Sequence, residues 1–198
     1  MLKNNSYLKT ILKDSVDGVD YISVINPTTE LGKLLRPDYL HTFDTVFGKV
    51  ISIRRVMEFL NRVDYPIKFL TKCKLTSIDI KRIRKCEIKH IKNYWTYILY
   101  ATIKRVSSDP KLIELMRNNT LDYVALGNEV VKEELFNQEI EVKKHFVKLS
   151  YYVSCLRIVD KLIKDGDLEN KEIINELLDT EAGGNFMEKI LAVNTELV

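Results

Sequence analysis

The stretch that decides the fold is residues 93–110, whose sequence is NYWTYILYATIKRVSSDP. Asn93 is a favourable helix N-cap residue. Behind it, mostly apolar residues recur at the spacing of one helix face: Trp95, Ile98, Leu99, Thr102 and Val106. Asp109-Pro110 then places a capping residue before a proline that suits the first helical position. The stretch therefore predicts a buried helix that is followed at once by a second helix.

The same periodicity predicts further helices on both sides of this stretch. Apolar stripes with capping or stop signals mark segments 37–50, 52–60, 76–83, 110–116, 149–164 and 168–179. In segment 37–50 the stripe consists of Tyr39, Leu40, Phe43, Val46, Phe47 and Val50. A weaker pattern predicts one more helix over residues 129–136.

Two short segments favour strand instead. Val19–Ile25 is rich in β-branched residues, and residues 139–143 alternate between charged and apolar side chains. If the first segment pairs with Ile140–Val142, the chain has a small two-stranded β appendage.

The composition favours helices over a turn-rich β fold. Apolar residues make up 45% of the chain, enough for a core, while there are only 7 Gly and 4 Pro. We therefore expect a mainly α fold, a compact multi-helix domain that spans residues 1–198. Within it we expect an N-terminal helix and a strand segment in 1–36, a helical core in 37–180 and a C-terminal tail in 181–198.

The cysteines and the hydropathy pattern indicate a cytoplasmic protein. Three cysteines, Cys73, Cys86 and Cys155, are an odd number in a chain long enough to build its own core, which argues against a disulfide framework. No run of about 18 apolar residues suggests a membrane span, and the first ten residues do not resemble a secretory signal. We expect a location in the cytoplasm, or in a virion if the protein is viral.

Positive charge is concentrated in one segment. Residues 68–92 contain nine Lys and Arg against two acidic residues, in a chain whose net charge is only +3. Such a cluster suits phosphate backbones or an acidic protein surface, but a solvated helix face gives the same pattern. Isoleucines interrupt the cations every few residues, which is more typical of an amphipathic docking element than of a phosphate-binding groove. The candidate contact residues are Lys81, Arg82, Arg84, Lys85, Lys89, Lys92 and Tyr94.

No metal, cofactor or catalytic motif is recognisable. Cys73, Cys86 and His90 lack the close pairing of zinc ligands, so we expect two buried cysteines and a surface histidine. The acidic residues of segment 165–176 resemble a calcium loop in part, yet Asn170 occupies the position that requires glycine. The glycines form no phosphate-binding loop, and the serines and histidines suggest no triad. We therefore name no catalytic, metal-binding or cofactor-binding residue.

These observations favour a non-enzymatic helical protein that binds other proteins. The abundance of Lys, Ile and Asn is typical of AT-rich genomes such as those of many bacteriophages. We expect an assembly adaptor, or a binder of a host or phage protein, that contacts a protein partner or further copies of itself. Two alternatives stay open: a nucleic-acid-binding protein that uses residues 68–92, and an enzyme whose site is not visible in the sequence.

Overall fold

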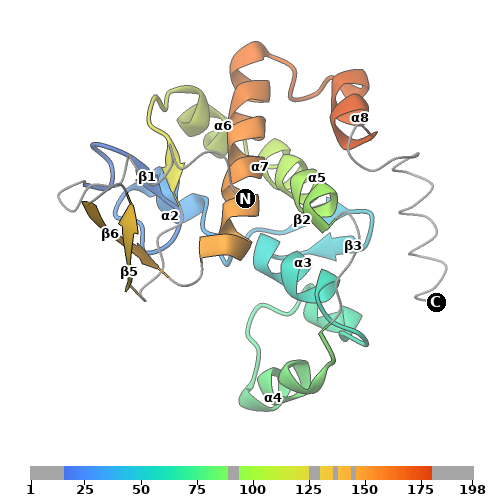
Figure 1. Cartoon of the computed structure of the whole chain (residues 1–198). Helices are drawn as coiled ribbons and strands as arrows, with labels where there is room; N and C mark the ends of the chain where they lie inside the picture. The colour runs from blue at the N-terminus through green and yellow to red at the C-terminus, as the bar shows by residue number, and fades with distance from the viewer. Residues whose placement is uncertain (1–15, 89–93, 125–129, 136–137, 144–145, 180–198) are drawn as a thin grey trace.

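Two helices form the centre of the molecule. Helix α5 (Tyr94–Ser107) arises from the stretch that carries the strongest apolar stripe, and it packs along helix α7 (Phe146–Asp165) (Figure 1). Ile98 and Leu99 of α5 and Leu156 and Val159 of α7 are completely buried. The buried helix that the central stretch predicts is therefore confirmed, and its packing against α7 is what the structure adds.

The computed structural model describes residues 16–88, 94–124, 130–135, 138–143 and 146–179. Its elements, in chain order, are β1 (Ile22–Ser23), α2 (Glu30–Leu34), β2 (Phe43–Thr45), β3 (Gly48–Val50), α3 (Ile53–Leu60), the 3-10 helix η1 (Ile67–Phe69), α4 (Ser77–Lys85), α5, α6 (Pro110–Arg117), β4 (Tyr123–Val124), β5 (Val130–Leu135), β6 (Gln138–Lys143), α7 and α8 (Lys171–Asp179). About half of the described residues are helical. The prediction of a mainly α fold is confirmed.

The remaining helices pack around the central pair. Helices α3 and α6 contact α5, α6 also contacts α7, and α8 contacts α5. Three helix starts follow predicted capping residues: the Ser52 side chain accepts from the amide of Arg55, the Thr76 hydroxyl accepts from the amide of Asp79, and Asp109 accepts from the amide of Leu112 beside Pro110. These ends are decided by local chemistry, because a cap needs only residues within one turn.

The predicted helix over residues 37–50 is wrong. The segment instead forms the β2–β3 hairpin, in which Phe43 pairs with Val50 and both side chains are buried. Gly48 turns the chain with a φ of 90°, a conformation that glycine adopts without strain, and the Thr45 hydroxyl donates to the Gly48 carbonyl. Apolar residues at positions 43, 46, 47 and 50 fit a helix face, but the turn at Gly48 interrupts that helix.

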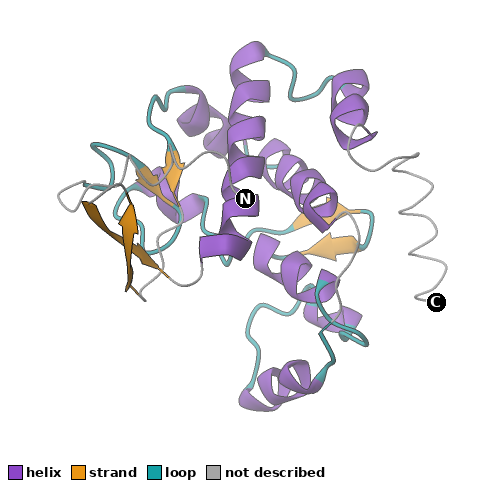
Figure 2. Cartoon of the chain, viewed as in Figure 1, coloured by secondary structure: helices purple, strands orange, loops and turns teal. Residues whose placement is uncertain are grey.

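The predicted strand pairing is also wrong. β1 lies within Val19–Ile25, but it pairs in parallel with β4, so that Ile22 faces Tyr123. Segment 140–142 belongs to β6, which pairs with β5, and β5 occupies the segment that was predicted to be a helix over 129–136. Within the described chain there are thus three separate two-stranded sheets, shown in orange in Figure 2.

A close approach to β1 explains one glycine of α2. A Cβ atom at Gly32 would lie 2.4 Å from the Ser23 carbonyl oxygen, closer than real atoms approach. Any side chain there would push α2 away from β1, so the absence of a side chain keeps the helix against the strand.

The apolar stripes identify much of the core correctly. Phe43, Leu99, Leu112 and Leu156 are buried, while Phe47 is half-buried against Phe59. The side chain of Trp95, the N-terminal segment 1–15 and the tail 181–198 lie outside what the structure describes. The division of the chain into 1–36, 37–180 and 181–198 stays a prediction.

Candidate interaction surface

Part of the basic segment projects from the body as a finger. The chain leaves the body after Leu70 and returns at Ile88, which pairs with Arg62 in an antiparallel bridge. The amide of Val63 donates to the Glu87 carbonyl at 2.9 Å and closes the base. We call residues 71–88 the basic finger; helix α4 lies within it, set apart from the other helices in Figure 1.

The residues before the finger are anchored in the core. Tyr65, Phe69 and Leu70 are buried, and Tyr65 meets both Phe59 and Phe69 edge to face, with ring centroids 6.1 and 6.0 Å apart. The amide of Ile51 donates to the Leu70 carbonyl. The finger therefore projects from a firmly packed base.

The N-terminal end of α4 is held by a capping box. The Thr76 hydroxyl accepts from the amide of Asp79, and the Asp79 carboxylate accepts from the amide of Thr76. Lys72 donates to the same carboxylate at 2.6 Å. The bond from Lys72, together with those from Thr76, lowers the pKa of Asp79 to about 2, so this end stays intact at neutral and mildly acidic pH.

The C-terminal end of α4 is held by a residue of the body. Nη1 of Arg62 donates to the carbonyl of Ile83 at 3.0 Å and, more weakly, to that of Cys86 at 3.4 Å. A guanidinium is favourable here because the last carbonyls of a helix lack partners and carry partial negative charge. Arg62 thus links α4 to the body and holds its orientation.

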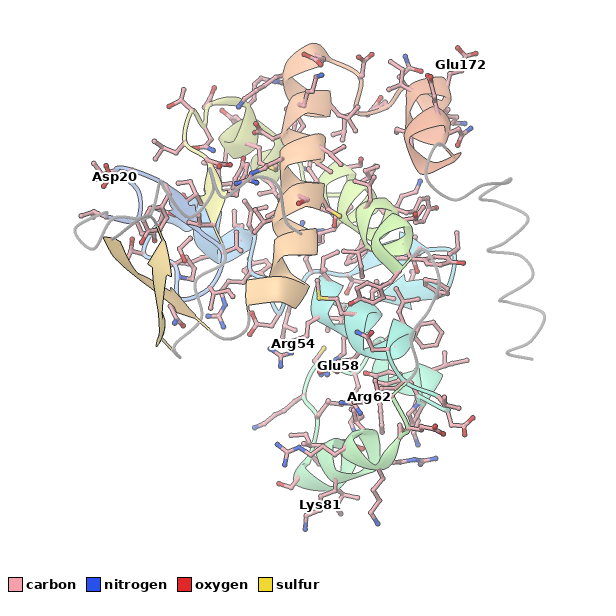
Figure 3. All side chains as sticks on the ribbon, in the orientation of Figure 1. Asp20, Arg54, Glu58, Arg62, Lys81 and Glu172 are labelled. Carbon is pink, nitrogen blue, oxygen red and sulfur yellow. The ribbon has the colours of Figure 1, made fainter. Side chains whose placement is uncertain are left out.

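One face of α4 points away from the body. Ile83, on the inner side, is 5% exposed. The outer side carries four residues at the i, i+3, i+4 and i+7 spacing of a single helix face: Ile78, Lys81, Arg82 and Lys85. Figure 3 shows Lys81 at the outer extremity of the molecule.

This outer face combines unpaired charge with apolar surface. Ile78 is 78% exposed, and the three cations beside it form no ion pair with any residue that the structure describes. Three further isoleucines in or beside the finger are exposed: Ile67, Ile80 and Ile88. The sequence predicts the cations as contacts, but it does not separate these isoleucines from core residues. For Ile78 the helix spacing could have done so in part, because Ile78 and Ile83 lie on opposite sides of one helix and cannot both face the core.

The structure brings together four of the seven predicted contact residues. Lys81, Arg82 and Lys85 lie on the outer face of α4, and Arg84 is exposed at its flank. Lys89 and Lys92 lie outside the described residues.

Tyr94 occupies a different environment from these cations. Its side chain is half-buried at the start of α5, and its hydroxyl oxygen accepts from Nδ2 of Asn61 at 3.1 Å. Burial raises the pKa of the Tyr94 hydroxyl to about 12. Tyr94 therefore contributes to the packing of α5 on α3, and its role as a contact residue stays a prediction.

The cysteines of the finger differ from expectation. Cys73 is exposed and Cys86 is half-buried, although both were expected to be buried. The prediction fails because both residues lie in the finger, where only Ile83 is buried between residues 71 and 88. His90 lies outside the described residues, and the rest of the described chain holds no group of three metal-binding side chains.

A second polar cluster, in the body, superficially resembles a hydrolytic triad. Nε2 of His41 lies 3.1 Å from Oγ of Ser108, and Nδ1 lies 3.8 Å from Asp109. The Ser108 hydroxyl, however, donates to the Arg105 carbonyl at 2.8 Å, so its proton is not directed at the imidazole. Asp109 caps α6 through Leu112 and pairs with the buried Arg105. The role of the cluster is therefore structural, because Asp109 both neutralises the charge of Arg105 and caps the first turn of α6.

The comparisons with known proteins do not identify a relative. No protein-family model matches the chain, no curated protein is similar to it, and no solved structure shares its fold at a significant level. None of the helices in the described ranges has both the length and the apolar character needed to cross a membrane.

Proposed function

We propose that this protein is a non-enzymatic binding protein whose basic finger docks on an acidic protein surface. The observation that supports this proposal is the outer face of α4, where the exposed side chain of Ile78 lies among Lys81, Arg82 and Lys85. A protein interface uses both components, since an apolar contact excludes water at its centre while charges around it orient the partner.

The exposed isoleucine favours a protein partner over nucleic acid. An ion pair on a solvated surface contributes only about 0–1 kcal/mol to the free energy of binding. Surface cations therefore raise the association rate and orient the partner more than they stabilise the complex. A phosphate backbone would use the three cations equally well, but it offers no apolar surface to cover Ile78. Nucleic-acid binding through the finger is therefore the alternative that the experiment must separate.

The experiment compares two probes by fluorescence anisotropy. One is an acidic amphipathic peptide built from Glu and Leu, and the other is a set of single-stranded and duplex oligonucleotides. We expect the peptide to bind more tightly, and we expect both K81A/R82A/K85A and I78S to weaken peptide binding by about tenfold or more, as loss of a central contact does.

Matched controls lie elsewhere on the surface. K33A/K49A/K161A removes three exposed cations outside the finger, and V19S removes an exposed apolar side chain. Both should leave peptide binding unchanged. The nucleic-acid alternative predicts tighter binding to the oligonucleotides than to the peptide, with no effect of I78S. It also predicts that log affinity falls by about 0.7–0.9 per contacted phosphate for each tenfold rise in salt concentration. These results together would contradict the proposed function.

The biological setting extends the proposal beyond the finger. We propose that the protein comes from a bacteriophage and acts in assembly, in the virion or in the host cytoplasm. This part of the proposal is supported by the amino-acid composition and by the absence of a recognisable enzymatic motif in the sequence. A partner that is itself acidic and helical, including a further copy of this chain, fits the finger best.

A further inference from the structure

The molecule carries an acidic surface that matches the finger in charge. Residues 165–176, which we call the acidic end, form the turn between α7 and α8 and most of α8. This segment contains five carboxylates against the single cation Lys171, a formal charge of −4. The basic finger contains six cations against two carboxylates, a formal charge of +4.

The acidic end is accessible in the same way as the finger. Asp165, Glu169 and Glu172 are exposed, and their carboxylates form no ion pair with any other described residue. Ile173 and Ile174, in the first turn of α8, are only half-buried. Both pack against the core, so they leave a smaller apolar surface beside the carboxylates than Ile78 leaves beside the cations on α4.

The two surfaces are at opposite ends of one molecule. Figure 3 labels Lys81 at one extremity and Glu172 at the other, with the α5–α7 core between them. Because this core separates them, the finger cannot reach the acidic end of its own chain. Their charges can only be matched between molecules.

We infer that the basic finger of one copy docks on the acidic end of a second copy, so that the chains associate head to tail. This inference rests on the proposed function of the finger and names its partner. Contacts between two different surfaces of identical chains leave one finger and one acidic end free at each step, so they extend into open chains unless the geometry closes a ring. Ion pairs between Lys81, Arg82 or Lys85 and Glu169 or Glu172 would supply the orientation, and Ile78 would cover the half-buried isoleucines of α8.

The test is the average mass of the nuclease-treated protein by sedimentation equilibrium at increasing protein concentration. In about 0.01 M salt, where charges act over about 30 Å, the mass of the wild type should rise above that of a monomer. In about 1 M salt, where the range falls to about 3 Å, it should return to the monomer value.

Two charge reversals separate this arrangement from nonspecific aggregation. K81E/R82E/K85E changes the finger from +4 to −2, so both ends of the molecule are acidic, and D165K/E169K/E172K changes the acidic end from −4 to +2, so both ends are basic. Each variant alone should remain a monomer, because its two ends repel. An equimolar mixture should associate again, since each reversed finger or end then meets an opposite charge on the other variant. Circular dichroism checks that both are folded, and K81Q/R82Q/K85Q replaces the first if it is not.

Three outcomes of the sedimentation experiment can be distinguished. Association of the wild type that both reversals abolish and the mixture restores supports the inference. A wild type that is monomeric at every concentration and salt overturns it, and so does a mixture that stays monomeric. If the acidic peptide still binds the finger in either of these cases, only the head-to-tail arrangement fails, and the proposed function stands.

Discussion

Replacing Arg62 by Met should loosen the basic finger without unfolding the body. The guanidinium donates to the carbonyls of Ile83 and Cys86 at the end of α4, at 3.0 and 3.4 Å, and methionine retains most of the aliphatic length but no donor. A hydrogen bond from a charged donor contributes about 1.5–3 kcal/mol. Because Arg62 is half-exposed and its second bond is long, we expect a net loss of about 1–2 kcal/mol, confined to the finger.

Hydrogen–deuterium exchange measured by mass spectrometry reports this loss locally. A loss of 1–2 kcal/mol corresponds to about a 5–30-fold increase in the opening of α4, so the amides of residues 77–86 should exchange faster by that factor. The amides of α5 and α7 should keep their wild-type rates, because the core that protects them does not include Arg62.

The control is R54M, on helix α3. The side chain of Arg54 is 62% exposed, and it forms an ion pair at 3.5 Å with Glu58, one turn away on the same helix. R54M should leave exchange in α4 unchanged. Wild-type exchange of residues 77–86 in R62M, or an equal acceleration across the whole protein, would refute the view that Arg62 clamps the finger to the body.

Three further predictions concern the body. Leu99→Ala should lower the free energy of unfolding by about 2–5 kcal/mol in chemical denaturation, because the side chain is completely buried in the core. A loss below about 0.5 kcal/mol would contradict that burial. Burial, with the nearby Arg105, lowers the pKa of His41 below 6.5, so the unfolded chain binds its proton first. The contribution of neutral His41 to the free energy of unfolding should therefore be fully present above pH 6.5 and fall as the pH drops through that value towards the lowered folded-state pKa. H41Q should remove this part of the pH dependence of the denaturation midpoint. An unchanged pH profile in H41Q would exclude His41 as its source. Gly48→Ala should cost about 1–3 kcal/mol from the positive φ alone, since nothing lies within 4 Å of the added methyl group, and an unchanged melting temperature would show that the β2–β3 turn can relax.

Local chemistry in the sequence decides much of this structure. The capping box of Thr76 and Asp79 and the Asp109-Pro110 start of α6 each depend on residues within a single turn, so they could be predicted before the fold was known. The stripe of Leu99 likewise predicts one buried face of α5, because its periodicity repeats over several turns, although packing also buries residues outside the stripe, such as Tyr97 and Arg105. The concentration of cations in α4 is also a property of the sequence alone.

Tertiary structure decides what short-range patterns leave ambiguous. Phe43 and Val50 fit a helix face as well as a hairpin, and only the turn at Gly48 and the shared burial of both side chains select the hairpin. β1 pairs with β4, about a hundred residues later, because their backbone groups meet across the folded core. The outward direction of Ile78 and Lys81 depends on Arg62 and Ile83, which hold the opposite side of α4 to the body. A sequence shows which residues share a helix face, but only packing shows whether that face meets the core or water.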